Sequence, residues 1–408
     1  MERPSIWLML AIVLASLLFL REPRLQRYDE GFLRWLLRNS RPAGGVIPLT
    51  IVDIGRDEAD KKKPETKRSA IKKASPLEYA IFLQAALEFK PTVIAFESIL
   101  QWGERNKDQE QFVDQAMRVP KLLAAAELTA APDLDAPIVE IPGFTQVTGR
   151  RGDLPTFSGI ARQPDEDIRL LGTLGFINLP GDAADEVHVP LLFNYRGEVI
   201  PSFALQAALL WMRITPTEVK IDIGSYIYLP NGKKIPIRAD GTALINPNAV
   251  KRARRLRLNE LFLAAQQHEA KTPTTSRVEN MGDDIVLARS AGDQPSLPDP
   301  FAATIATIQS NSFVHRVSWI FDCVFILVLV LASGFVRKFS RIDIVLIAIA
   351  ITAAYCLAGL ALVSRWSIWL PGVLPLSATW LVAFFCLFAP RRKDDPDLPS
   401  VAPSPPSL

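Results

Sequence analysis

The chain has 408 residues, of which 49% are hydrophobic, with a mean hydropathy of +0.16 and a formal net charge of +3. The near-neutral charge gives no reason to expect a nucleic-acid partner, and the apolar fraction is high for a soluble protein. All three cysteines lie in apolar segments near the C-terminus, so no disulfide staples the polar middle of the chain. That middle part spans about 300 residues, enough to bury its own core without one.

The apolar excess is concentrated in four blocks, each near the length that crosses ~30 Å of hydrocarbon as a helix. We predict a transmembrane anchor helix at residues 5–20 and three transmembrane helices within residues 319–389. An extracytoplasmic domain, residues 21–318, lies between them, and a disordered proline-rich cytoplasmic tail follows at residues 390–408. The first block could also be a signal peptide, but "FLREPR" offers no small-residue cleavage site, which favours an uncleaved anchor.

The lysines and arginines of the short loops predict the orientation in the membrane. "RKFSR" at 337–341 and "RRK" at 391–393 follow the second and fourth blocks, whereas only Arg365 lies between the third and fourth. Positive loops stay cytoplasmic, so both termini are expected inside and the large domain outside, as in a multi-pass protein of a bacterial inner membrane with a periplasmic domain. Five arginines between Arg21 and Arg38 oppose this orientation, but long domains translocate largely regardless of charge.

The first half of the polar domain alternates between apolar strands and amphipathic helices. After a short helix at residues 28–39, the expected elements are a strand at 49–54, a helix capped by Ser75, a strand at 92–97, a helix at 108–117 and a strand or short helix at 121–128. Such alternation predicts parallel strands joined by right-handed crossovers. The expected fold class is therefore a mixed α/β domain with a partly parallel sheet, plus four transmembrane helices.

The second half of the domain continues the α/β pattern. The expected elements are strands at 176–180 and 187–194, a helix at 202–214, a meander at 219–237 with a turn at Asn231-Gly232, a buried strand in "DDIVLARSA" and a helix at 299–314. Residues 129–163 are rich in proline and glycine and are expected to be loop. Residues 56–73 are highly charged and are expected to form a solvated surface loop.

Two of the buried strands each carry an acid near the C-terminal end, Asp53 and Glu97. Binding crevices of open α/β sheets form beyond the C-terminal ends of the strands, so both acids would lie there, on neighbouring strands. A ligand cation or an internal arginine is the expected partner, with Arg289 of "IVLARS" as the candidate. Strand-end acids also cap loops and helices for structural reasons, so this alternative stays open.

The sequence "KRARRLR", residues 251–257, is densely basic. One interpretation is a solvated face of the domain. The other is contact with anionic lipid headgroups or with an acidic partner.

No catalytic constellation is evident. His188, His268 and His315 lack metal-ligand spacing, and no G-x-S-x-G, G-x-x-x-x-G-K or G-x-G-x-x-G motif occurs. We therefore predict that the protein has no cofactor, no metal and no enzymatic activity. Asp53 and Glu97 could form the acid–base pair of an envelope hydrolase, but no nucleophile or metal ligand supports that alternative.

Several segments occur in the order found in one family. "LGFINLPGDAADEVHVPLLF" resembles that family's Gly-Phe-Asn, acidic-turn, then Pro-Leu pattern most strongly. With the order of the apolar blocks, the resemblance covers residues 21–389 and is to the type 2 CHASE domain, a cyclase/histidine-kinase-associated sensory extracellular domain. The other matching segments are "IPLTIVDIGRDE", "SPLEYAIFLQAAL", "PTVIAFESIL", "DQEQFVDQAM" and "DDIVLARSAGD".

The resemblance implies a periplasmic or extracellular sensor domain whose members usually feed a cytoplasmic histidine kinase, Ser/Thr kinase or nucleotide cyclase. The family's usual first-strand acid matches Asp53, whereas Glu97 stands where the second strand usually carries Asp. The Trp/Pro/Arg cluster usual before the first helix is reduced to Ser75-Pro76-Leu77.

The C-terminal tail is too short and too rich in proline to form such an output domain. The expected partners are thus the lipid bilayer, a separate membrane or cytoplasmic signalling protein and a possible second copy of the chain. A scaffold subunit of an envelope complex is the alternative function.

Asp322 is an ionisable residue about one turn into the second apolar block. A charge costs roughly 2.5–3.5 kcal/mol at the bilayer centre, so such a residue normally faces protein or water. Asp322 is expected either at the outer interface beside Trp319 or packed against another span. Ser333 and Gly334, three turns further along, would let a second helix approach closely. These three residues, Asp322, Ser333 and Gly334, are the candidate coupling residues for a signal crossing the membrane.

Overall fold

The structure is a computed structural model that describes residues 23–41, 44–55, 74–103, 106–131, 141–179, 187–271, 278, 281–290, 299–336 and 340–388. The chain divides into two compact units. The larger unit holds residues 34–315 and 360–369, and the smaller unit holds the remainder of the chain. The expected anchor helix at 5–20, the charged loop at 56–73 and the tail at 390–408 lie outside the described residues.

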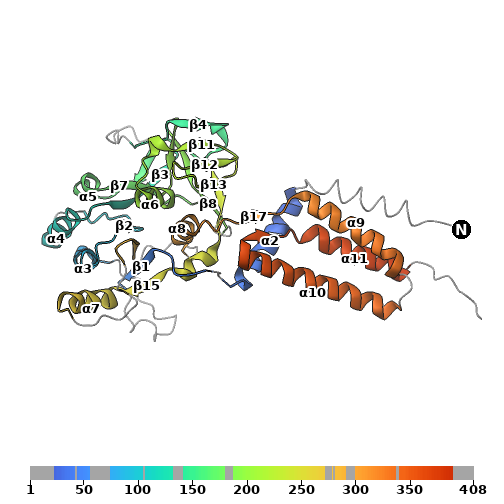
Figure 1. Ribbon diagram of the computed structural model, residues 1–408. Coiled ribbons are helices and arrows are strands. Elements are labelled where there is room, and N and C mark those ends of the chain that lie inside the picture. The colour runs from blue at the N-terminus through green and yellow to red at the C-terminus, as the bar shows by residue number, and fades with distance from the viewer. Residues whose placement is uncertain are drawn as a thin grey trace, which may run out of the picture. The chain divides into compact units, whose positions relative to one another are not determined.

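The larger unit is built around a sheet with the strand order β15-β1-β16-β2-β3-β6, in which β7 also pairs with β3. Figure 1 labels β15, β1, β2, β3 and β7 of this sheet. All of these pairings are parallel except that of β3 with β6. The expected mixed α/β domain with a partly parallel sheet is thus confirmed. The strands are β15 (Arg254–Arg257), β1 (Leu49–Ile54), β16 (Ile285–Ser290), β2 (Val93–Phe96), β3 (Leu122–Thr129), β6 (Gly159–Arg162) and β7 (Thr173–Phe176).

The prediction that β1 and β2 are neighbours is wrong, because β16 lies between them. β16 comes last of the seven strands in the chain, yet it pairs with β1 from Leu49↔Ile285 to Ile54↔Ser290 and with β2 on its other side. All six residues of β16 are buried. A strand that is buried on both faces belongs in the centre of a sheet, and that requirement outweighs chain order here.

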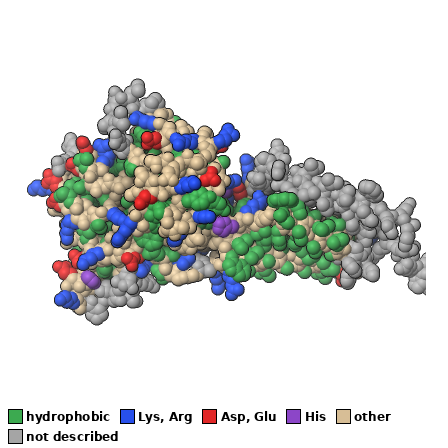
Figure 2. All heavy atoms as spheres, turned by 45° about the horizontal axis from the view of Figure 1, so that its top comes forward, with side chains coloured by type: hydrophobic (Ala, Val, Ile, Leu, Met, Phe, Trp, Pro, Cys, Tyr) green, Lys and Arg blue, Asp and Glu red, His purple; other side chains and the backbone are tan. Residues whose placement is uncertain are grey.

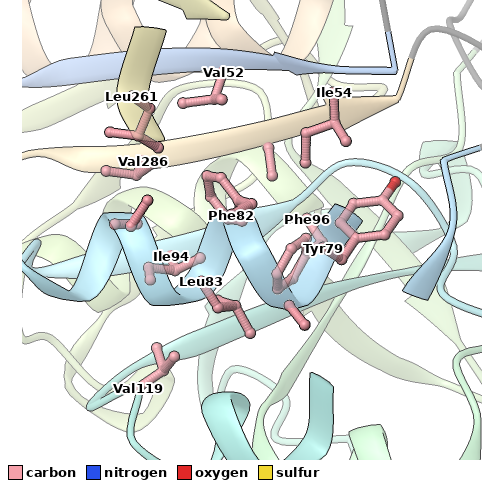
Figure 3. Close-up of a cluster of buried hydrophobic side chains, with 14 of the residues drawn as sticks. Val52, Ile54, Tyr79, Phe82, Leu83, Ile94, Phe96, Val119, Leu261 and Val286 are labelled. Atoms are coloured by element: carbon pink, nitrogen blue, oxygen red, sulfur yellow. The ribbon is translucent and has the colours of Figure 1, made fainter. Parts of the chain in front are cut away.

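One face of the sheet is covered by three helices, α3 (Pro76–Leu87), α4 (Lys107–Ala116) and α7 (Leu258–Glu269). Figure 3 shows Phe82 of α3 and Leu261 of α7 near the strand residue Val286, and Leu83 of α3 near Ile94 of β2. α3 begins as expected. The Ser75 side chain accepts from the Glu78 N–H, and the Ser75 N–H donates to the Glu78 carboxylate at 2.6 Å. This capping box fixes where the helix starts.

The opposite face is covered by α6 (Phe203–Met212) and α8 (Pro300–Ser310). Along β1 the residues facing these helices are Leu49 and Ile51, which alternate with the residues facing α3. α8 stops earlier than the expected helix at 299–314, because Asn311 adopts a left-handed conformation (φ 51°) and ends it. Asp53 comes two residues after Ile51 in β1, so it points to the same face as Leu49 and Ile51. It therefore lies at the end of the face that α6 and α8 cover.

Smaller sheets complete the larger unit. The expected meander forms as β11-β12-β13, and Gly232 takes the positive φ of 79° in its turn. Residues 129–163 are not a plain loop, because β4, β5 and β6 lie within them. Other strands of the larger unit include β4 (Gln146–Thr148), β5 (Thr156–Phe157), β8 (His188–Pro190), β9 (Leu192–Tyr195), β10 (Glu198–Pro201), β11 (Lys220–Asp222), β12 (Tyr226–Tyr228), β13 (Lys234–Pro236), β14 (Thr242–Leu244) and β18 (Ile368–Trp369).

The smaller unit is helical, with α9 (Trp319–Val336), most of α10 (Arg341–Trp366) and α11 (Val373–Phe388), preceded by the start of α2 (Pro23–Asn39). Among the described helices, only α10 is both long and apolar enough to cross a membrane, while α9 and α11 contain shorter apolar stretches. Large hydrophobic side chains are widely exposed on this unit, as Figure 2 shows in green. Leu331, Ile342 and Leu357 are each more than three-fifths exposed, which is unusual for a surface that faces water.

Candidate functional site

Asp53, Arg289 and Glu97 lie in one row at the C-terminal edge of three adjacent strands. Asp53 of β1 is in register with Arg289 of β16. Glu97 directly follows β2, and its N–H donates to the Ala288 carbonyl at 3.1 Å, which places it beside Arg289. Residues that pair laterally in parallel strands point to the same face, so the three side chains share the face covered by α6 and α8.

Arg289 is the centre of this strand-edge cluster. Its Nη2 lies 2.9 Å and its Nε 3.2 Å from Asp53 Oδ1, which is the internal arginine contact expected for Asp53. Its Nη1 pairs with Asp299, and Asp299 also pairs with Arg255 of β15. The Arg289 side chain is 8% exposed and that of Asp53 is 18% exposed. Two acids and two arginines therefore alternate in a chain of ion pairs with no net charge.

Asp299 is a member of this cluster that sequence reasoning did not identify. It precedes Pro300 and was expected to begin a helix, and α8 does begin there. However, its side chain makes no capping hydrogen bond, and the residue adopts φ 51°, ψ 48°. A left-handed conformation is uncommon outside glycine, and aspartate is among the residues that tolerate it. This conformation accompanies a carboxylate that pairs with Arg289 and Arg255 instead of with its own helix.

Glu97 is buried beside the ion pairs without joining them. It is 3% exposed, and neither of its carboxylate oxygens has a hydrogen-bond partner among the described residues. Burial raises the pKa of Glu97 to about 7; the Arg289 charge opposes this rise and the Asp53 charge adds to it. Glu97 is therefore poised to change charge near neutral pH, in a position where its charge acts on Arg289.

The cluster offers a carboxylate that can accept a proton, a cation or hydrogen-bond donors, held next to a neutral chain of ion pairs. The side chains around Glu97 are positioned by three central strands, which makes the site rigid. In the described ranges, no group of three or more His, Cys, Asp or Glu residues is arranged to hold a metal ion. The geometry thus suits recognition of charge or protonation.

Two arginines of the basic run at residues 251–257 differ from both interpretations of the sequence. Arg254–Arg257 form the edge strand β15, where Arg254 pairs with Asp284 at 3.5 Å and Arg255 pairs with Asp299. These two arginines are thus neither simply solvated nor available to a partner molecule. The sequence contains no signal for these pairings, because each joins residues that are distant in the chain.

The three candidate coupling residues all lie in α9 of the smaller unit. Asp322 is completely buried, and neither of its carboxylate oxygens has a hydrogen-bond partner within the described part of the chain. The Asp322 side chain is therefore covered by other residues of the smaller unit. Ser333 donates to the Val330 carbonyl at 2.6 Å and lines a 40 Å³ cavity between α9, α10 and α11. Gly334 follows it in the same helix.

Asp29 is a buried acid in the smaller unit that sequence reasoning missed. Its carboxylate accepts from the backbone N–H groups of Gly372 and Val373, at 3.0 and 2.9 Å, at the start of α11. It also pairs with Arg316 at 3.1 Å. A carboxylate at a helix N-terminus satisfies free N–H groups and complements the helix dipole. Arg316 and Asp29 are both close enough to act electrostatically on Asp322.

Comparison with known proteins identifies one family. The family model described as the CHASE2 domain matches residues 6–330. No curated protein and no solved structure matches the chain. The match spans most of the sequence and agrees with the α/β architecture of the larger unit, so the chain belongs to the CHASE2 family of extracellular sensory domains.

Proposed function

We propose that this protein is an integral membrane sensor, whose CHASE2 domain responds to a ligand or stimulus outside the cytoplasm and signals through a separate partner protein. The observation that carries the proposal is the match to a sensory family over residues 6–330, followed by α10, a helix able to cross a membrane. The exposed hydrophobic side chains of α9, α10 and α11 support placing all three helices in lipid. Together with the apolar segment at residues 5–20, they make four spans with both termini cytoplasmic.

The strand-edge cluster of Asp53, Arg289, Asp299 and Glu97 is the proposed site of response. Its support is the buried Glu97 carboxylate, which has no hydrogen-bond partner among the described residues and lies next to Arg289. An unsatisfied buried carboxylate is costly to a fold and is commonly retained for function. A bound cation, or a proton, would change the net charge of the cluster and hence the balance of its ion pairs.

Reporter fusions test the proposed topology. A reporter that is active only in the cytoplasm should work when fused after Lys338 or after Leu408, and it should fail after Gly241. The reason is that arginine- and lysine-rich loops stay cytoplasmic, which places the larger unit outside. A second reporter that is active only outside the cytoplasm, fused at the same three positions, should give the opposite pattern. Cytoplasmic activity after Gly241 would reverse the orientation and refute the proposed sensor.

Crosslinking in native membranes tests coupling to a partner through Asp322. The variant Asp322→Leu removes the charge with a side chain that suits lipid, so membrane insertion should survive. If Asp322 helps to arrange the helices for a partner, the variant should lose at least one protein crosslinked by the wild type. Ile320→Leu is the matched control, since Ile320 is an exposed neighbour in α9, and it should keep the wild-type set. Identical sets for the wild type and Asp322→Leu would exclude Asp322 from coupling.

A further inference from the structure

A polar pocket of about 210 Å³ lies in the larger unit, away from the strand-edge cluster. All of its lining residues belong to that unit, including three from the C-terminal end of α10 and Ser367, which follows the helix. Its volume is below the ~300 Å³ at which sites for drug-sized molecules begin, so it suits one small chemical group. Its polar lining includes the side chains of Asn246, Arg252, Ser310, Ser312, Ser364 and Arg365.

The pocket is basic and contains no acid. Arg252 and Arg365 line it, and no aspartate or glutamate does. Neither arginine forms an ion pair within the described ranges, in contrast to Arg254, Arg255 and Arg289 of the same unit. Arg252 donates its Nε to the Gly45 carbonyl at 2.7 Å, which orients its guanidinium and leaves both Nη groups for another acceptor. Two arginines in a pocket without a carboxylate attract an anion.

Further donors in the pocket have no acceptor of their own in the described part of the chain. The Asn246 side-chain oxygen accepts from the Asn248 N–H at 3.0 Å, which leaves the Asn246 amide N–H groups available. Ser364 likewise makes no side-chain hydrogen bond with the described residues. Ser310 and Ser312 bond to each other at 2.8 Å, so their oxygens stay fixed at the wall. The available groups are therefore mainly donors, which matches the acceptor oxygens of a phosphate.

The placement of the pocket along the chain indicates where such a phosphate is available. Ser364 and Arg365 are at the C-terminal end of α10, and Trp366, which follows them, is 59% exposed. Tryptophan and arginine at the end of a spanning helix are typical of the headgroup level of a bilayer. In the proposed topology this end of α10 is at the outer surface of the membrane.

We propose that this pocket binds a phosphate group through Arg252 and Arg365. The phosphate is that of a lipid headgroup or a soluble phosphate, and both present the same oxygens to the two guanidinium groups. Binding would hold the end of α10 against the 246–252 segment and the end of α8, which also line the pocket. Only the lipid source depends on the proposed topology, because binding of soluble phosphate requires no membrane.

Two binding measurements on the full-length protein test the pocket. In the first, inorganic phosphate is titrated into protein in a neutral detergent, with sodium chloride matched for ionic strength. In the second, the protein is extracted from nanodiscs of phosphatidylglycerol or phosphatidylcholine, and the retained lipid is counted by mass spectrometry. Arg365→Gln is the first variant, because Arg365 is exposed and forms no side-chain hydrogen bond or ion pair with the described residues. Loss of one charge-assisted interaction should weaken binding about tenfold.

The double variant Arg252→Gln, Arg365→Gln should weaken binding further than Arg365→Gln alone. The control, Arg118→Gln with Arg150→Gln, removes the same charge from exposed positions outside the pocket and should bind like the wild type. Retention of phosphatidylglycerol without binding of inorganic phosphate would identify a lipid headgroup as the ligand. Binding of inorganic phosphate would identify a soluble source. If folded Arg365→Gln and the wild type bind equally in both measurements, the proposal is overturned. The activity of the reporter fusions does not depend on phosphate binding. A wrong topology is therefore distinguishable from a pocket that binds no phosphate.

Discussion

Replacing Arg289 by leucine is expected to lower the free energy of unfolding by about 3–5 kcal/mol, the loss typical of removing one partner from a buried ion pair. Arg289 is the shared partner of Asp53 and Asp299, so the change leaves two carboxylates without their central counter-charge. Folding still removes these two acids from water, but the Arg289 guanidinium no longer offsets the free-energy cost of doing so. Equilibrium urea unfolding of the full-length protein in a mild detergent, followed by far-ultraviolet circular dichroism, measures the effect.

The matched control is Arg162→Leu. Arg162 pairs with Glu127 at 2.6 Å, but the two side chains are 56% and 35% exposed, so water screens the pair. An exposed pair contributes about 0–1 kcal/mol, and this variant should stay within that range. In a double-mutant cycle, Asp53→Leu combined with Arg289→Leu should recover part of the loss, because it removes one stranded carboxylate. Equal losses for Arg289→Leu and Arg162→Leu would show that the strand-edge pairs are unimportant for stability.

The stability of the domain is expected to fall as the pH rises from about 4.5 to about 7, and Glu97→Gln should abolish that part of the fall. The pKa of Glu97 is raised from 4.5 to about 7 in the folded state, so the folded state binds more protons than the unfolded state between these values. Stability therefore decreases with pH in that window, and above it the full penalty is present. A rise of this size corresponds to about 3 kcal/mol for a buried group.

The Glu97→Gln variant should accordingly equal the wild type near pH 4.5 and be up to about 3 kcal/mol more stable at pH 8. Urea unfolding of both proteins at several pH values provides the measurement. Glu269→Gln, at an exposed position of α7, removes a carboxylate of the same unit and should follow the wild-type curve. A constant difference between Glu97→Gln and the wild type at every pH would mean that the Glu97 carboxylate does not titrate in this window.

Arg289 and Glu97 are expected to have different roles within one cluster. Arg289 is expected to be needed for folding, whereas Glu97 is expected to reduce stability at neutral pH. A residue that weakens the fold at the pH where its charge changes is suited to a switch, because a proton or a bound cation relieves the same penalty. The energy available to such a switch is the penalty itself, a few kcal/mol, which is enough to shift a two-state equilibrium substantially.

The sequence by itself determined the local elements and the chemistry of the candidate residues. Continuous apolar runs located β1, β2 and β16, and Ser75 located the start of α3, because capping and burial act over a few residues. The acids at the strand ends and the arginine of "IVLARS" were visible for the same reason. The order of sensory-family segments was visible too, and the match to residues 6–330 confirms it.

Only the tertiary structure decided which of these residues meet. β16 enters the sheet between β1 and β2 because its six buried residues need strands on both sides, and this places Arg289 between Asp53 and Glu97. Asp299 joins them from α8, and the basic run at 251–257 divides between β15 and the phosphate pocket. These contacts join segments that are far apart in the chain, and their energy depends on burial and charge pairing, which exist only once the sheet and its helices are assembled.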